Sequence, residues 1–136
     1  MQPEFECWSQ LKQSLHFHEP RRLFKEGEIW WCRIGQNIGD EQNGKGKSFS
    51  RPVLIFRKFN SSIFIGVPLS TKIKQKHYYH TLHFKGRVQS AVLSQIRLMD
   101  AKRLENKMGK LPLSEFLKLS ESLKELLFKN TQPSNY

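Results

Sequence analysis

The apolar residues at the start of the chain follow a helical period. They recur every three or four positions, at Phe5, Trp8, Leu11 and Leu15. With polar residues between them, this spacing predicts an amphipathic helix over residues 3–18. Pro20 ends the helix, because the residue before a proline disfavours the helical backbone. A linker over residues 21–27 follows, so we expect residues 1–26 to form a helical extension in front of the main domain.

From residue 28 onward the apolar positions alternate with polar ones or form short runs bounded by turn residues, which is typical of β-strands. The predicted strands cover residues 28–34, 52–58, 63–69, 78–84 and 91–98, with a shorter strand over 107–111. Asn60-Ser61-Ser62 and Lys85-Gly86 are turn signals between them. Short strands at this spacing predict a small antiparallel β-barrel, closed or nearly closed, that removes exposed sheet edges.

The C-terminal part of the chain carries helix signals. Asp100 is a suitable N-cap for one or two helical turns through Leu104. Ser114 is the expected cap of a final helix, with Glu115 in its first turn. The tail, residues 131–136, is expected to be frayed. The barrel domain therefore extends over residues 27–130.

The positive charge of the chain is concentrated in its middle. The formal net charge is +11, and there is no Asp or Glu from Gln42 to Met99. That stretch contains eleven basic residues, Lys45, Lys47, Arg51, Arg57, Lys58, Lys72, Lys74, Lys76, Lys85, Arg87 and Arg97. A segment of one sign attracts polyanions and speeds their encounter, so nucleic acid is the expected partner. The alternative is a basic surface that only aids solubility.

Other features indicate a cytoplasmic protein outside the membrane. The two cysteines, Cys7 and Cys32, are too few for a disulfide framework or a zinc site. No apolar run approaches the roughly 18–20 residues that cross a bilayer. The first residues, Met1 to Glu6, carry acids and no apolar core of a secretory signal.

Five short motifs follow one another from residue 27 onward. They are Gly27-Glu28-Ile29-Trp30, Gly39-Asp40-Glu41-Gln42, Arg51-Pro52-Val53-Leu54-Ile55, Val67-Pro68-Leu69-Ser70-Thr71, and Ser90 to Asp100 followed by Lys102-Arg103-Leu104. Each motif alone is weak. In this order, over about residues 25–128, they resemble the MazF/PemK toxins, in which the corresponding segments read G-[DE]-[IV]-[WY], G-x-E-Q, R-P-V-L, V-P-[IVLC]-T and S-V-x-L-x-Q-I-R-T-I-D-x-x-R-L.

The resemblance implies a mainly β fold, a small SH3-like antiparallel barrel of the MazF/PemK/CcdB type with a C-terminal helix. It also implies a homodimer that cleaves single-stranded RNA at a short motif and is inhibited by a small acidic antitoxin. The arginine of the R-P motif and the hydroxyl residue of the second site strand carry the chemistry in that family, and they correspond to Arg51 and Ser70. The E-Q loop contacts RNA and corresponds to Glu41 and Gln42.

The residue chemistry agrees with RNA cleavage that needs no metal ion. RNA supplies its own nucleophile, the 2′-hydroxyl, so the protein has only to assist proton transfer and stabilise charge on the phosphate. Arg51 offers a permanent cation with forked donors, and Ser70 offers a further hydrogen bond. Because the central segment lacks carboxylates, a two-metal site is hard to build there. We therefore expect no cofactor, and products with 2′,3′-cyclic phosphate and 5′-hydroxyl ends.

The chain departs from the family pattern at two places. Eight residues separate Gln42 from Arg51 where the family has three, and this loop contains Lys45, Lys47 and Phe49. We expect it to be mobile and to contact RNA, with Phe49 stacking on a base. The family threonine corresponds to Ser70, or to the adjacent Thr71 if the register slips by one, and the two would face opposite sides of a strand. The full set of expected RNA contacts is Gln42, Lys45, Lys47, Phe49, Thr71, Lys72 and Gln95.

The proton acceptor is the least defined role. Glu41 is the nearest acid in the motifs and is the candidate base. His77, His80 and His83 are spaced like a metal or base cluster, but residues three apart on a strand face opposite sides, so ordinary strand or loop positions are expected. Two alternatives to an RNase remain: a non-enzymatic toxin that binds a protein such as DNA gyrase on the same fold, and an RNA-binding module that has lost cleavage.

Overall fold

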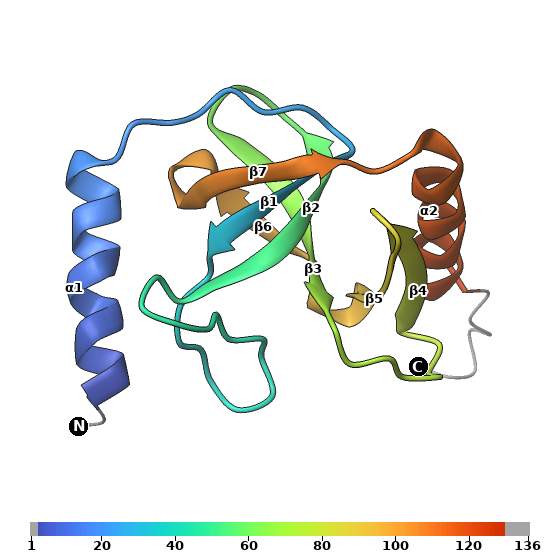
Figure 1. Ribbon diagram of the computed structural model, residues 1–136, viewed down its shortest axis with the longest axis horizontal. Coiled ribbons are helices and arrows are strands. Elements are labelled where there is room, and N and C mark those ends of the chain that lie inside the picture. Colours follow the sequence, from blue (N-terminus) through green and yellow to red (C-terminus); the bar gives the residue numbers. More distant parts are fainter. Residues whose placement is uncertain (1–2, 130–136) are drawn as a thin grey trace.

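The strands of the chain form one antiparallel sheet, with a helix at each end of the molecule (Figure 1). The computed structural model describes residues 3–129, so the frayed tail expected over residues 131–136 lies outside it. The helices are α1 (Pro3–His18) and α2 (Leu113–Leu127). The strands are β1 (Glu28–Arg33), β2 (Ser50–Lys58), β3 (Ile63–Ser70), β4 (Tyr79–Phe84), β5 (Arg87–Val92), β6 (Arg97–Asp100) and β7 (Leu104–Lys110).

The strand order is β4-β5-β3-β2-β1-β7, and β6 also pairs with β3. Within the described part of the chain β4 and β7 each pair on one side only, so the sheet stays open. The Lys85 ammonium, in the β4–β5 turn, donates to the Met108 carbonyl of β7 and links the two ends. The expected class, mainly antiparallel β with a C-terminal helix and an N-terminal helical extension, is confirmed.

The single strand expected over residues 91–98 is wrong. Ile63 pairs with Asp100 and Ser70 pairs with Ser90, so seven steps along β3 (70 − 63) correspond to ten steps (100 − 90) along the facing chain. A continuous antiparallel strand matches its partner residue for residue, which leaves three residues too many. They form the 3-10 turn η1 (Leu93–Gln95), which divides the segment into β5 and β6.

The chain beyond β6 follows the expectation in part. The Asp100 carboxylate accepts a hydrogen bond from the Lys102 backbone N–H at 2.8 Å and caps a single 3-10 turn, η2 (Ala101–Arg103). β7 then begins at Leu104, ahead of the expected residue 107, because Leu104 already pairs with β1. The expected cap at Ser114 is wrong. α2 begins at Leu113 after Pro112, whose fixed φ suits a helix start and whose missing N–H costs no hydrogen bond there.

Two apolar clusters hold the helix α2 and the linker on the sheet. The first lies between the sheet and α2 and includes Leu54, Leu69, Leu82, Leu119 and Leu123. The second includes Phe24, Trp30, Val53, Phe64 and Met99. Phe24 brings the linker into the second cluster, with its ring 5.2 Å from that of Phe64. Burial of each such side chain contributes about 1.5–3 kcal/mol to the free energy of unfolding, so α2 and the linker are both firmly attached to the sheet.

Glu28 explains the acidic position of the first motif. Its carboxylate accepts hydrogen bonds from the Trp30 indole at 3.1 Å and the Lys25 backbone N–H at 2.8 Å, and it pairs with Lys107 at 2.7 Å. Burial alone would raise the pKa of Glu28, but these contacts outweigh it and the pKa is lowered. Glu28 therefore joins the linker, β1 and β7, which is a structural role.

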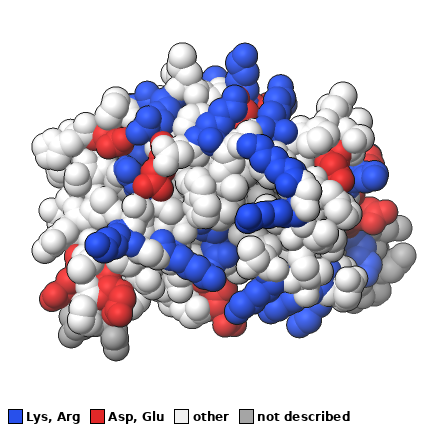
Figure 2. Space-filling model, viewed as in Figure 1, with Lys and Arg blue, Asp and Glu red and all other residues white. Residues whose placement is uncertain are grey.

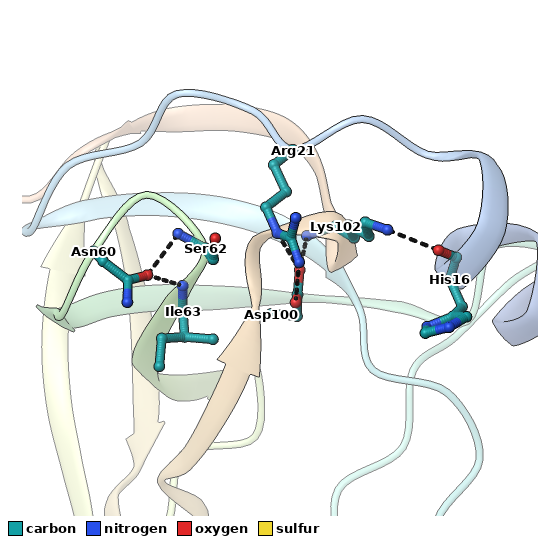
Figure 3. Close-up of polar contacts among 7 residues, drawn as sticks. All are labelled: His16, Arg21, Asn60, Ser62, Ile63, Asp100 and Lys102. Carbon is teal, nitrogen blue, oxygen red and sulfur yellow. Dashed lines mark hydrogen bonds and ion pairs between the residues drawn. The ribbon is translucent and has the colours of Figure 1, made fainter.

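The N-terminal helix is confirmed, and it lies beside the sheet rather than on it (Figure 1). Its apolar side chains Trp8 and Leu15 are buried, with Phe49 in the same cluster. At its C-terminal end Lys102 donates to the His16 carbonyl at 2.7 Å, and Arg21 of the linker forms a two-bond pair with Asp100 (Figure 3). No helix among residues 3–129 is long and apolar enough to span a bilayer.

Candidate active site

Arg51 lies at the start of β2, beside the end of β3 that carries Ser70. Val53 faces Pro68 in the β2–β3 pair, and the same register continued by two residues brings Arg51 opposite Ser70. The Arg51 guanidinium donates from Nε to the Asn43 carbonyl at 2.8 Å and from Nη1 to the Leu69 carbonyl at 3.3 Å. These two bonds fix the guanidinium beside the end of β3.

The charge of Arg51 is permanent although the side chain is half-buried. Desolvation disfavours the charged form and lowers the pKa of Arg51. An arginine nevertheless stays protonated in proteins under ordinary conditions. The site therefore has a fixed cation in a partly desolvated position, where its interaction with an anion is stronger than in open water.

Ser70 and Thr71 border the same cavity as Arg51, which has a volume of about 340 Å³. Ser70 is the last residue of β3, and Thr71 is the first residue beyond it. Because the strand ends there, Thr71 is not bound by the alternation of side chains, and both residues border the cavity; the assignment of the site hydroxyl to one of them stays a prediction. The Lys72 backbone N–H donates to the Ser70 Oγ at 3.2 Å, so the hydroxyl keeps its own proton for donation.

The composition of this cavity suits an anion. Lys45 and Gln89 also line it, and among residues 3–129 no carboxylate or imidazole borders it. Cationic and hydroxyl donors around one space, with no acid to repel the ligand, match the oxygens of a phosphodiester.

Trp31 borders the Arg51 cavity, although the expected site residues do not include it. It is 38% exposed and lines the cavity, across the β1–β2 pair from Pro52. The signal was present, because Trp30, Cys32 and Ile34 point to the core and the alternation of a strand turns Trp31 to the other face. Its ring offers a stacking surface for a base next to Arg51.

Glu41, Gln42 and Gln95 lie around a neighbouring cavity of about 400 Å³ and not around that of Arg51. The Glu41 carboxylate accepts the Ile38 backbone N–H at 2.8 Å. The Gln95 amide donates to the Asp40 carbonyl at 3.1 Å and accepts the Gln42 N–H at 3.4 Å, so it holds the loop in place. The roles of Glu41 as a base and of both glutamines as RNA contacts stay predictions.

The long loop before β2 contains a short hairpin, and the stacking role of Phe49 is not supported. The Phe49 side chain is only 7% exposed, with its ring 5.7 Å from that of Trp8. Lys45 and Ser50 form a β-bridge that closes the loop into a hairpin. A lone aromatic in a polar loop looks available for RNA, but here the helix α1 covers it. The sequence offered no means of pairing these two segments.

The charged residues of the loops remain accessible. Lys45, Lys47 and Lys72 are all exposed, and Lys45 lines the Arg51 cavity. Lys and Arg side chains cover much of the face seen in Figure 2, while most acidic side chains lie towards its margins. This distribution favours a polyanion lying across the sheet.

The three histidines do not form a cluster. His80 bonds through Nδ1 to the Ser122 Oγ at 2.8 Å, and His83 lies 3.5 Å from Glu115. Among the residues that the structure describes, no group of three His, Cys, Asp or Glu side chains is placed to hold a metal ion. Cys7 and Cys32 are free thiols, the second of them buried.

His80 predicts a pH dependence of stability. Burial between β4 and α2 lowers the pKa of His80. Among the smaller effects, the charge of Glu115 raises this pKa and the charge of Lys118 lowers it. As the pH falls through about 6.5, the pKa of an unfolded histidine, the unfolded state therefore binds more protons at this position than the folded state. The contribution of His80 to the free energy of unfolding is present above that pH and is lost as the pH falls. We expect the Tm to fall between pH 7 and pH 5 by a few degrees more in the wild type than in His80→Gln. Equal pH profiles in thermal unfolding would contradict this assignment.

Comparison with known proteins places the fold among the MazF structures. A mycobacterial endoribonuclease solved with its cognate antitoxin has a TM-score of 0.63 at 13% identity, covering 81% of this chain and 100% of that chain. MazF from Deinococcus radiodurans has a TM-score of 0.64 at 18% identity, with 79% and 98% covered. The Mycobacterium tuberculosis toxin MazF-mt6 has a TM-score of 0.57 at 13% identity, with 76% and 99% covered. Sequence comparison with curated proteins finds no significant match.

One family accounts for the sequence motifs and the fold together. Its sequence profile, described as the PemK-like, MazF-like toxin of type II toxin–antitoxin systems, matches residues 25–127. That range begins at the end of the linker and ends with α2, so it contains every strand and both cavities described above. The chain belongs to the PemK-like, MazF-like family of type II toxins.

Proposed function

We propose that the chain is an endoribonuclease that cleaves single-stranded RNA at a short sequence motif without a metal ion. One observation carries the proposal: Arg51 and Ser70, from two adjacent strands, border one cavity that has the size and the donors for a phosphodiester. Membership of a toxin family whose known activity is RNA cleavage supports the same conclusion.

The proposed reaction uses the RNA 2′-hydroxyl as the nucleophile. Its oxygen attacks the adjacent phosphorus and loses its proton, and the bond from phosphorus to the 5′-oxygen breaks. The 5′-oxygen leaves with a proton, which gives a 2′,3′-cyclic phosphate and a 5′-hydroxyl. Negative charge builds on the phosphate oxygens during this step, and donors already in place there lower the barrier most.

Arg51 and Ser70 have distinct roles in this scheme. The two carbonyl acceptors hold Nε and Nη1 of Arg51, and among residues 3–129 Nη2 donates to no protein group. The Nη2 amino group is therefore the donor that remains for the phosphate. The Ser70 hydroxyl, which already accepts the Lys72 N–H, donates its proton to a second phosphate oxygen.

The RNA strand is proposed to lie across both cavities. The bond between Arg51 and the Asn43 carbonyl joins the cavity of the scissile phosphate to the loop that carries Glu41 and Gln42. A base on the Arg51 side would stack on Trp31. The exposed side chains of Lys45, Lys47 and Lys72 would each neutralise one backbone phosphate.

We also propose the assembly and partners that the family implies. These are a homodimer and a small acidic antitoxin, in a cytoplasmic setting away from the membrane. The acid-free stretch from Gln42 to Met99 favours an acidic partner on the same face as RNA. The complexes of a mycobacterial endoribonuclease with its cognate antitoxin and of MazE with MazF give the precedent.

Incubation with a long single-stranded RNA in EDTA tests the proposal. We expect discrete cuts at a recurring short motif, with 2′,3′-cyclic phosphate and 5′-hydroxyl ends in end-specific labelling. Cleavage that appears only when magnesium is added, or products with 5′-phosphate ends, would show that a different chemistry operates. Binding of RNA without any cuts would identify a module that has lost cleavage.

A further inference from the structure

The N-terminal helix lies outside the part of the chain that defines the family, yet it packs against the loop that leads to Arg51. The family profile begins at residue 25, whereas α1 ends at His18. Trp8 of α1 is 7% exposed and is packed with Phe49 of the loop, which is equally buried. This contact joins a helix outside the matched range to the loop that leads to Arg51.

Trp8 rests directly on the backbone of Gly35. A Cβ atom added at Gly35 would lie 2.0 Å from the Trp8 ring, so no other residue fits there without moving the ring. Gly35 also has φ +82°, in the left-handed region that favours glycine. The indole and the glycine backbone therefore form one close-packed contact at the entrance of the loop.

The same glycine holds the two sides of the loop together. The Gly35 N–H donates to the Phe49 carbonyl at 3.1 Å, and the Gly35 carbonyl accepts the Gly44 N–H at 2.8 Å. A Cβ at Gly44 would lie 1.6 Å from the Phe49 carbonyl oxygen, so the backbone is in direct contact here. We call these three residues, Gly35, Gly44 and Phe49, the loop bracket. Trp8 covers the bracket at both Gly35 and Phe49.

The loop bracket is directly followed, on the N-terminal side of Gly44, by the carbonyl group that orients Arg51. Asn43 precedes Gly44, and its carbonyl accepts the Arg51 Nε–H at 2.8 Å. The Asn43 side chain adds a second restraint, since its oxygen accepts the Asn37 N–H at 2.6 Å. A shift of the bracket would move the Asn43 carbonyl and, with it, the plane of the Arg51 guanidinium.

The attachment of α1 does not depend on Trp8 alone. Leu15 is buried, the His16 carbonyl accepts a hydrogen bond from Lys102, and the linker pairs through Arg21 with Asp100 (Figure 3). Loss of the indole would therefore leave the helix in place and remove the packing on the bracket.

We propose that α1 is a positioning element of the active site. Trp8 holds the loop bracket, the bracket places the Asn43 carbonyl, and that carbonyl aligns Arg51. This inference rests on the proposed ribonuclease function. It makes Trp8 a positioning residue, since it touches neither the cavity nor the substrate.

The test compares Trp8→Ala with Phe17→Ala in the full chain. Phe17 is on the same helix but is 71% exposed, so its loss removes an aromatic ring without touching the loop. Misplacement of a catalytic group by about 1 Å can cost on the order of a hundredfold, so we expect Trp8→Ala to lower kcat about tenfold to a hundredfold. KM should change by less than roughly threefold, because ground-state binding is retained. Trp8→Phe should recover most of the activity, and Phe17→Ala should match the wild type.

A second measurement separates this inference from the function it rests on. Exchange of the Arg51 Nε–H with solvent, followed by NMR, should be faster in Trp8→Ala than in Phe17→Ala, whether or not RNA is cleaved. A wild type that cuts no RNA would refute the proposed function alone. Unchanged Arg51 exchange, an unchanged kcat, or equal losses in the two variants would refute the positioning role. If Trp8→Ala does not fold, Trp8→Leu is judged by the same criteria.

Discussion

Replacing Arg51 with alanine is expected to remove most RNA cleavage while the fold stays intact. The guanidinium is the permanent cation of the cavity, and its loss removes a contact made to charge that develops in the transition state. Loss of one such donor costs about a hundredfold or more in kcat. Leu69 borders the cavity, and water that enters the space left by the side chain can bond the Asn43 and Leu69 carbonyls, so the Tm should shift by only a few degrees.

Arg57→Ala is the matched control for this variant. Arg57 is on the same strand, is exposed, and pairs with Glu26 at 4.0 Å, away from the cavity. Both variants are assayed on the same RNA in EDTA, with initial rates over a range of RNA concentrations. If Arg51→Ala cuts as fast as Arg57→Ala, Arg51 has no part in the reaction.

Ser70→Ala is expected to lower kcat by about a hundredfold and to leave RNA affinity nearly unchanged. The hydroxyl donates to the phosphate mainly when charge develops there, so its removal affects the transition state more than the bound substrate. Ser70→Thr keeps the hydroxyl and should stay active. Filter binding of an uncleavable RNA with 2′-methoxy groups separates affinity from rate.

Thr71→Ala is the comparison that assigns the hydroxyl. Thr71 borders the same cavity but lies beyond the end of β3. We expect it to cleave within a few-fold of the wild type, with at most a weaker affinity for RNA. A large loss of kcat in Thr71→Ala together with normal cleavage by Ser70→Ala would move the catalytic hydroxyl to Thr71.

Strands in which apolar and polar residues clearly alternate could be predicted from the sequence. Strands whose conformation depends on pairing with a distant strand could not. β1, β2 and β3 carry apolar side chains at strand period between turn residues, and their bounds were close to those observed. β7 has the sequence Leu-Glu-Asn-Lys-Met-Gly-Lys, with few strand-forming residues. Its conformation comes from pairing with β1, which lies far away in the chain.

The turn within residues 91–98 was missed for a similar reason. Ser94 is a single turn-forming residue next to Gln95, a weaker signal than the cluster Asn60-Ser61-Ser62, and the buried Leu93 is typical of a strand. The break follows from the number of residues needed to match β3, which is a property of the pairing and not of the local sequence.

The site shows the same division. The motifs singled out Arg51 and Ser70, and the structure places both residues beside one cavity, at the ends of the paired strands β2 and β3. The burial of Phe49 depends on Trp8, and nothing in either segment indicates the other. Likewise, the separation of Glu41 from the Arg51 cavity results from the bonds of its loop to Gln95, a contact between distant parts of the chain.

The pairing of β1 with β7 has a consequence for synthesis of the protein. Glu28 pairs with Lys110, and the Leu111 N–H donates to the Gly27 carbonyl at 2.8 Å. The backbone hydrogen bonds on one side of the first strand, β1, are therefore made by the last strand, β7. Until β7 leaves the ribosome, the outer edge of β1 has unpaired N–H and C=O groups. Trp31, which faces the cavity, is part of that unfinished strand. A nascent chain therefore cannot build the complete site before nearly all of the domain has been made, and fragments that stop before residue 104 would carry an open edge prone to aggregation.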